Sequence, residues 1–183
     1  MMEKKLYTIA VYSENNVGLL NQVSIIFTRR KLNIESLTVS ASAIEGVHKF
    51  TITTVCSEDM VDKVVQQIER KIDVLKAYYY TDDQIISQEI ALYKVKVESL
   101  LDSDEVEKLI RKHNARILEI TRVFTAIEKT GHYEELMQLY KDLKPYGVLQ
   151  FVRSGRVAIT TSPIEKLEEF LKQIDAKYGD VAV

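Results

Sequence analysis

Two hydrophobic periodicities alternate along the chain and predict strands and helices in a regular order. Apolar residues at every second position over residues 5–12 predict a strand, because strand side chains alternate between two faces. From residue 18 the apolar spacing becomes that of an amphipathic helix. The first half continues with predicted strands at 33–41, 47–56 and 74–81 and a helix at 57–71. This order is a ferredoxin-like βαββαβ pattern, with both helices on one face of an antiparallel sheet.

The second half of the chain repeats this order. The polar segment Asp82-Asp83-Gln84 lies between two patterned segments, and it predicts a linker at about residues 82–87. Beyond it we expect strands at 89–98, 115–122, 123–129, 148–152 and 157–161, and helices at 103–112 and 132–144. A last helix, with Pro163 in its first turn, carries an apolar stripe from Leu167 to Ile174. The predicted fold class is α+β, with two tandem ferredoxin-like modules at residues 1–82 and 88–183.

Charge and composition narrow the class of partner. The chain has 183 residues, with 25 basic and 27 acidic side chains and a net charge of −2. Without a clustered positive surface we expect no nucleic-acid binding. No apolar run approaches the ~20 residues of a membrane span, and the single cysteine, Cys56, fits a reducing compartment. We therefore expect a cytoplasmic protein with no membrane contact, and modules of ~80 residues favour an oligomer.

The sequence contains no recognisable arrangement of catalytic or metal-binding residues. The histidines His48, His113 and His132 have no metal-ligand spacing, and His113 falls on the apolar stripe of a helix. Cys56 ends a strand with no basic neighbour in sequence, which favours a buried structural thiol over a nucleophile. The phosphate-binding and nucleophile-elbow glycine motifs are also missing. We expect no catalytic residue, metal or cofactor in this chain.

The segment from Glu14 to Leu20 joins the first strand to the first helix and suits a small zwitterion. A helix N-terminus offers free backbone N–H groups to a carboxylate, and Gly18 permits close approach of a ligand. The Asn15 side chain both donates and accepts, and Asn33, which begins the next predicted strand, can accept from an ammonium group. Asparagine and glycine are also common in ordinary turns. The residues alone therefore do not decide between a ligand-binding loop and a turn with only a structural role.

Residues 14–40 resemble the N-terminal ACT domain of the regulatory small subunits of acetohydroxyacid (acetolactate) synthase. The pattern is Glu-Asn-x-x-Gly-x-Leu, then Phe-x-x-Arg, then Asn-Ile-Glu-Ser-Leu-Thr-Val. The resemblance covers about residues 3–162 and continues in four later segments: Asp73-Val74-Leu75, Glu89-Ile90-Ala91-Leu92, Thr130-Gly131 and Val152-Arg153-Ser154-Gly155.

This resemblance implies a homodimer in which two ACT domains lie side by side and share an amino-acid effector, usually valine. One protomer supplies Asn15 and the backbone N–H groups of Gly18, Leu19 and Leu20, and its partner supplies Asn33 and Ile34. The resemblance also implies a separate catalytic large subunit that carries thiamine diphosphate, magnesium and FAD. This chain would activate that subunit and confer feedback inhibition in branched-chain amino-acid biosynthesis.

The chain departs from the family pattern at three places. Asn21-Gln22 stands where many members have Ser-Arg, Lys31 stands where glycine is common, and residues 163–183 extend beyond the shortest members. The corresponding loop of the second repeat, residues 99–103, lacks the asparagine and glycine, and its Asp102 would repel a carboxylate. We infer a structural or partner-binding role for that repeat.

The residues leave two questions open, the effector and the choice between competing functions. The sequence does not choose between valine, leucine and isoleucine as the effector. The competing functions are another ACT-containing regulator, such as a transcriptional sensor, and a small enzyme of ferredoxin-like fold. A helix-turn-helix would favour the sensor and an acid–base pair the enzyme, and neither is found in the sequence.

Overall fold

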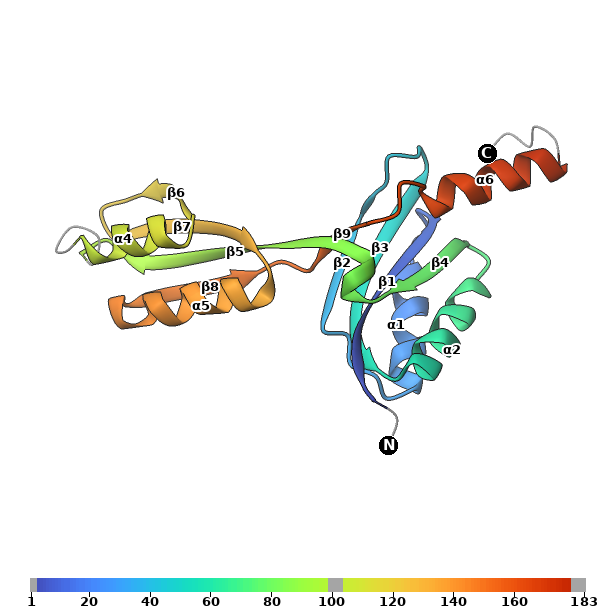
Figure 1. The fold of residues 1–183 in the computed structure, drawn as a ribbon, viewed down its shortest axis with the longest axis horizontal. Coiled ribbons are helices and arrows are strands. Elements are labelled where there is room, and N and C mark those ends of the chain that lie inside the picture. The colour runs from blue at the N-terminus through green and yellow to red at the C-terminus, as the bar shows by residue number, and fades with distance from the viewer. Residues whose placement is uncertain (1–2, 99–103, 179–183) are drawn as a thin grey trace. The chain divides into compact units, whose positions relative to one another are not determined.

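The computed structural model describes residues 3–98 and 104–178, which form two units (Figure 1). The first unit joins residues 1–86 with 158–183, and the second contains residues 87–157. The strands are β1 (Lys5–Glu14), β2 (Ser36–Ala41), β3 (Val47–Cys56), β4 (Val74–Tyr80), β5 (Ile85–Lys96), β6 (Arg116–Ile120), β7 (Phe124–Gly131), β8 (Val148–Arg153) and β9 (Val157–Thr160). The helices are α1 (Leu19–Arg29), α2 (Glu58–Glu69), α4 (Glu105–Lys112), α5 (Tyr133–Leu143) and α6 (Lys166–Tyr178), with short 3₁₀ turns at Asp82–Gln84 and Lys144–Tyr146.

The first unit is built on an antiparallel sheet of strand order β2-β3-β1-β4. Every second residue of β1 points to one face, and there α1 and α2 cover the sheet (Figure 1). The core between them contains Ile9 and Ile52, which are register partners on adjacent strands, and the buried stripes of both helices. Burying each such side chain stabilises the fold by about 1.5–3 kcal/mol. The predicted βαββαβ order is confirmed.

The second unit repeats the topology, with strand order β6-β7-β5-β8. Its core lies between the sheet and the two helices α4 and α5, and it includes Leu136, Leu139 and Leu143 of α5. The buried Tyr93 hydroxyl donates to the Leu136 carbonyl at 2.7 Å, which satisfies a polar group inside that core. The predicted α+β class with two ferredoxin-like modules is therefore confirmed.

The segment predicted as a linker, residues 82–87, is regular structure. A 3₁₀ turn at Asp82–Gln84 is closed by the Thr81 N–H, which donates to the Gln84 side chain at 3.1 Å. Strand β5 then begins at Ile85, four residues before the predicted start, and Ile85 is buried. Polar composition indicated a loop there, whereas the capped turn and the buried Ile85 order the segment.

The C-terminal residues depart from the predicted boundary, which assigned residues 88–183 to one domain. Residues from 158 onward belong to the first unit. Leu167 of α6, with Phe170 and Leu171, packs against Ala10 and Tyr12 on the face of the first sheet opposite α1 and α2. Burial of this apolar stripe on the first sheet is the physical reason for the difference. The helix also starts at Lys166, three residues after Pro163.

We expect Leu167→Ala to lower the stability of the first unit by about 2–4 kcal/mol, because it empties a fully buried site. Leu167 is 1% exposed, whereas the nearby Ile164 is 57% exposed. Ile164→Ala is therefore the matched control, with a change within about 0.5 kcal/mol. Hydrogen exchange of the β1 and β4 amides measures the effect. Equal protection of these amides in both variants would show that α6 does not stabilise the first unit.

Candidate functional site

The loop between β1 and α1 is held in place by the turn before β4. The Asn16 side chain donates to Asp73 at 2.8 Å and to Glu14 at 3.2 Å. The Glu14 N–H also donates to the Asp73 carbonyl at 3.0 Å. The Asp73 segment, which carries part of the family resemblance, thus positions the loop. Asn15 lies exposed between these anchored residues, and its side chain makes no hydrogen bond within the described part of the chain.

Gly18 directly precedes α1 and adopts a left-handed backbone conformation, with φ 88°. Glycine takes this conformation without the steric cost that a side chain brings. A Cβ at this position would meet no atom within 4 Å in the single chain. The glycine therefore forms the turn into the helix, and the space around it is open in the single chain.

The backbone donors of the helix start are only partly used. The Leu19 N–H donates to the Asn16 carbonyl at 3.3 Å, so this predicted contact for the effector is already engaged. In residues 3–98 and 104–178, Gly18 and Leu20 donate no backbone hydrogen bond. Leu19 is buried in the core, while Leu20 is 45% exposed. Gly18 and Leu20 are therefore the predicted N–H groups that remain available to a carboxylate.

Asn33 and Ile34 lie beyond the other end of α1. Asn33 is exposed, and its carbonyl accepts from the Thr54 hydroxyl at 2.7 Å. Ile34 is half-buried against the core of the first unit. Eleven helical residues separate them from the loop, a length of about 16 Å. The structure therefore does not bring the two halves of the predicted effector site together within one chain.

The loop of the second repeat at residues 99–103, with Asp102, lies outside the described residues. Two other segments of the family resemblance do meet in the second unit. Arg153 forms an ion pair with the buried Glu89, and the Ile90 N–H donates to the Ser154 hydroxyl at 2.9 Å. The Arg-Ser-Gly turn thus links the end of β8 to the middle of β5, which is a structural role.

Cys56 and His113 have structural surroundings rather than catalytic ones. Cys56 is buried, and burial raises the pKa of its thiol, which disfavours the nucleophilic thiolate. His113 hydrogen-bonds Asp142 at 2.8 Å, and this bond is the main cause that lowers the pKa of Asp142. Within the described ranges, no group of three or more His, Cys, Asp or Glu residues is arranged to hold a metal ion.

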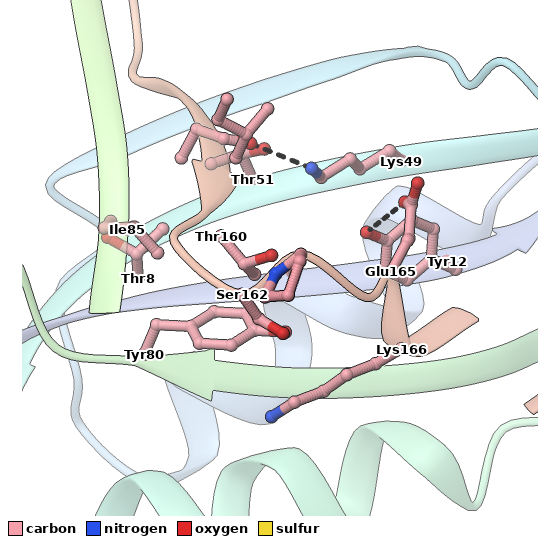
Figure 2. A pocket seen from close by; sticks show the side chains of 14 residues that line it. Thr8, Tyr12, Lys49, Thr51, Tyr80, Ile85, Thr160, Ser162, Glu165 and Lys166 are labelled. Carbon is pink, nitrogen blue, oxygen red and sulfur yellow. Dashed lines mark hydrogen bonds between the residues drawn. The ribbon is translucent and has the colours of Figure 1, made fainter. Parts of the chain in front are cut away.

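The first unit contains a pocket of about 210 Å³ that the sequence pattern did not predict (Figure 2). One wall is the sheet face opposite α1 and α2, and the other is the chain from Ala158 to Lys166, together with Ile85. The Lys49 ammonium donates to the Ala158 carbonyl at 2.9 Å, and the Tyr12 hydroxyl donates to Glu165 at 3.3 Å. Residues distant in sequence form this pocket, so periodicity cannot reveal it.

Burial changes the acid–base properties of the pocket side chains. Desolvation lowers the pKa of Lys49, although the charge of Glu165 opposes that effect. Desolvation and then the nearby Tyr78 raise the pKa of Tyr80 to about 12, and desolvation with Glu165 raises the pKa of Tyr12 further. Both tyrosines are neutral at physiological pH, and the partly desolvated Lys49 ammonium favours an anion beside it.

Family models match both halves of the chain. The model described as AHAS small subunit-like ACT domain matches residues 9–76, and the model described as small subunit of acetolactate synthase matches residues 88–162. The acetolactate synthase small subunit of Mycobacterium leprae is 31% identical over 157 residues, which cover 86% of this chain and 92% of that protein. The chain belongs to the acetolactate synthase small-subunit family.

Other relatives agree with this assignment. The acetolactate synthase small subunit of Bacillus subtilis is 32% identical over 164 residues, which cover 89% of this chain and 94% of that protein. The crystal structure of the acetolactate synthase small subunit from Thermotoga maritima shares the fold, with a TM-score of 0.79 and 23% identity, and the match covers 87% of this chain and 99% of that one. The resemblance found in the sequence is confirmed. In the described ranges, no helix has the length and apolarity to span a membrane.

Proposed function

We propose that this chain is the feedback-sensing subunit of an acetolactate synthase, and that two copies bind a branched-chain amino acid between their ACT domains. Valine is the first candidate effector. The observation that carries the proposal is the division of the site: Asn15 and Gly18 lie at one end of α1, and Asn33 lies beyond its other end. With a two-fold axis beside α1 and β2, the start of α1 in one copy lies next to the end of α1 in the other copy. The loop before α1 of one copy then lies next to Asn33 of its partner.

The first unit offers an edge suited to this pairing. Within the described sheet, β2 pairs only with β3, so one side of its backbone is unpaired. The same edge exposes Val39, and the loop and α1 expose Val17 and Leu20. Association of two copies along β2 would extend the sheet and bury these side chains. A homodimer therefore gives the marginal first unit additional buried apolar area.

The chemistry of the divided site matches an α-amino acid. The Gly18 and Leu20 N–H groups and the positive end of the helix dipole favour the carboxylate. The side-chain oxygens of Asn15 and Asn33 accept from the ammonium group. Leu20 and Ile34 supply apolar surface for the branched side chain, whose burial contributes about 1.5–3 kcal/mol.

The second unit supplies a surface for the catalytic partner. On the sheet face opposite α4 and α5, the side chains of Ile90 and Leu92 on β5 and Val152 on β8 are exposed, and Leu92 and Val152 are register partners. We assign this apolar stripe to contact with the large subunit. In this proposal thiamine diphosphate, magnesium and FAD belong to the large subunit, and this chain changes their reactivity only through the interface.

Reconstitution with the large subunit of the same source tests this function. We expect the chain to raise the rate of acetolactate formation and to make that rate sensitive to valine. Leucine and isoleucine, titrated in parallel, identify the preferred effector. An enzyme whose rate is the same with and without this chain, in a mixture where the two subunits co-sediment, would contradict the regulatory role.

A further inference from the structure

We propose that the pocket of the first unit binds a small aliphatic carboxylate, with the carboxylate at Lys49 and Thr51. This site is separate from the shared amino-acid site and does not rest on it. It lies on the sheet face opposite α1, under the segment from Ala158 to Lys166 (Figure 2). The described lining residues include two lysines and one glutamate, so the net charge of the pocket is positive.

Two polar side chains of β3, Lys49 and Thr51, line the pocket and have hydrogen-bonding capacity left for a ligand. Thr51 is 5% exposed, yet its hydroxyl has no hydrogen-bond partner within residues 3–98 and 104–178. Lys49, two residues away on the same face, is half-buried and directs one hydrogen bond to the Ala158 carbonyl. No carboxylate lies within 4.0 Å of its ammonium in that part of the chain. An ammonium has three donors and a hydroxyl one, and an anion would use those left over.

The rest of the pocket selects a short apolar body. Ala10, Ile85 and the ring of Tyr80 line the space beyond Lys49 and Thr51. The volume of about 210 Å³ is roughly seven times the ~30 Å³ that a water molecule occupies in the liquid. It therefore accommodates about seven non-hydrogen atoms, the size of a five-carbon monocarboxylate. A nucleotide or a peptide is too large for this pocket.

Glu165 sets the boundary of the site on the side of α6. It accepts from the Tyr12 hydroxyl at 3.3 Å and raises the pKa of Lys49 against the effect of burial. Lys166, the next residue, lies 5.0 Å from the centroid of the Tyr80 ring. Both residues follow residue 162, where the match to the family model ends. The roof of the pocket is thus built by the C-terminal segment of this chain.

Isothermal titration of the full chain with isovalerate tests the proposal. Lys49→Met keeps the apolar stem and removes the charge, and we expect it to weaken binding by about tenfold or more. Thr51→Val keeps the shape and removes the hydroxyl, and we expect a loss of about threefold to tenfold. Lys172→Met, an exposed position on α6, is the control with the same charge change and should bind like the wild type.

Competition by valine identifies the natural class of ligand. In a Gly18→Asp background, valine that displaces isovalerate assigns the pocket to an amino acid, and valine that does not displace it assigns the pocket to an acid without an amino group. Both results support a carboxylate site. The proposal is overturned if the wild type does not bind isovalerate at millimolar concentration, which would leave a pocket filled by water only. Equal binding by the wild type and both pocket variants would overturn it as well.

Discussion

Gly18→Asp is expected to weaken valine binding by about a hundredfold or more, which corresponds to roughly 3 kcal/mol. The substituted carboxylate would lie where the effector carboxylate meets the helix N-terminus, and repulsion in a partly buried site is only weakly screened. Titration calorimetry on the full chain gives the binding constant. In the reconstituted enzyme, the variant should still activate the large subunit, because the proposed activating surface lies in the second unit.

The conformation of Gly18 decides the control for this experiment. Aspartate at a helix start is favourable in general, but the φ of 88° makes any side chain at this position costly by about 1–2 kcal/mol. Gly18→Asn has the same size and the same backbone cost without the charge. We expect the asparagine variant to lose about tenfold in valine affinity, less than the aspartate variant. Equal affinity in the wild type and the aspartate variant would remove Gly18 from the site.

The periodicity of the sequence predicted both modules because each strand and helix buries one face along its own length. It could not assign α6, since an apolar stripe such as that from Leu167 to Ile174 shows that one face is buried but not against which sheet. The structure places α6 on the first unit, against Ala10 and Tyr12. The packing partner of α6 depends on the path of the chain, which returns to the first unit through β9.

In the candidate sites, too, features formed by neighbouring residues were predictable from the sequence, and features formed by residues distant in sequence were not. The loop at Asn15 and Gly18 was predictable, because a turn before an amphipathic helix is a local pattern. The pocket at Lys49 was not, because its second wall lies more than a hundred residues later in the chain. The only sequence signal was the pair Lys49 and Thr51 at alternating positions of β3, which by itself also fits an ordinary exposed sheet face.

The asparagine substitutions have the second large expected effect. Asn15→Ala and Asn33→Ala should each weaken valine binding by about thirtyfold to a hundredfold, since each removes a hydrogen bond to a charged group worth about 2–3 kcal/mol. Both residues are exposed in the single chain, so we expect the unfolding temperature to change little. Gln150→Ala, at an exposed position of β8, is a control for the loss of an amide side chain outside the proposed site. Wild-type affinity in Asn33→Ala would place the ammonium group elsewhere.

Mixing the two asparagine variants tests most directly whether the site is shared between copies. In a heterodimer of Asn15→Ala and Asn33→Ala protomers, one site contains both wild-type asparagines and the other contains neither. Random exchange of equal amounts should therefore restore about a quarter of the wild-type number of high-affinity valine sites, measured by equilibrium dialysis. Restoration of these sites after mixing is the result that the shared site predicts. If neither variant alone binds and the mixture, shown to contain heterodimers, gains no high-affinity site, the effector is not bound between two copies of this chain.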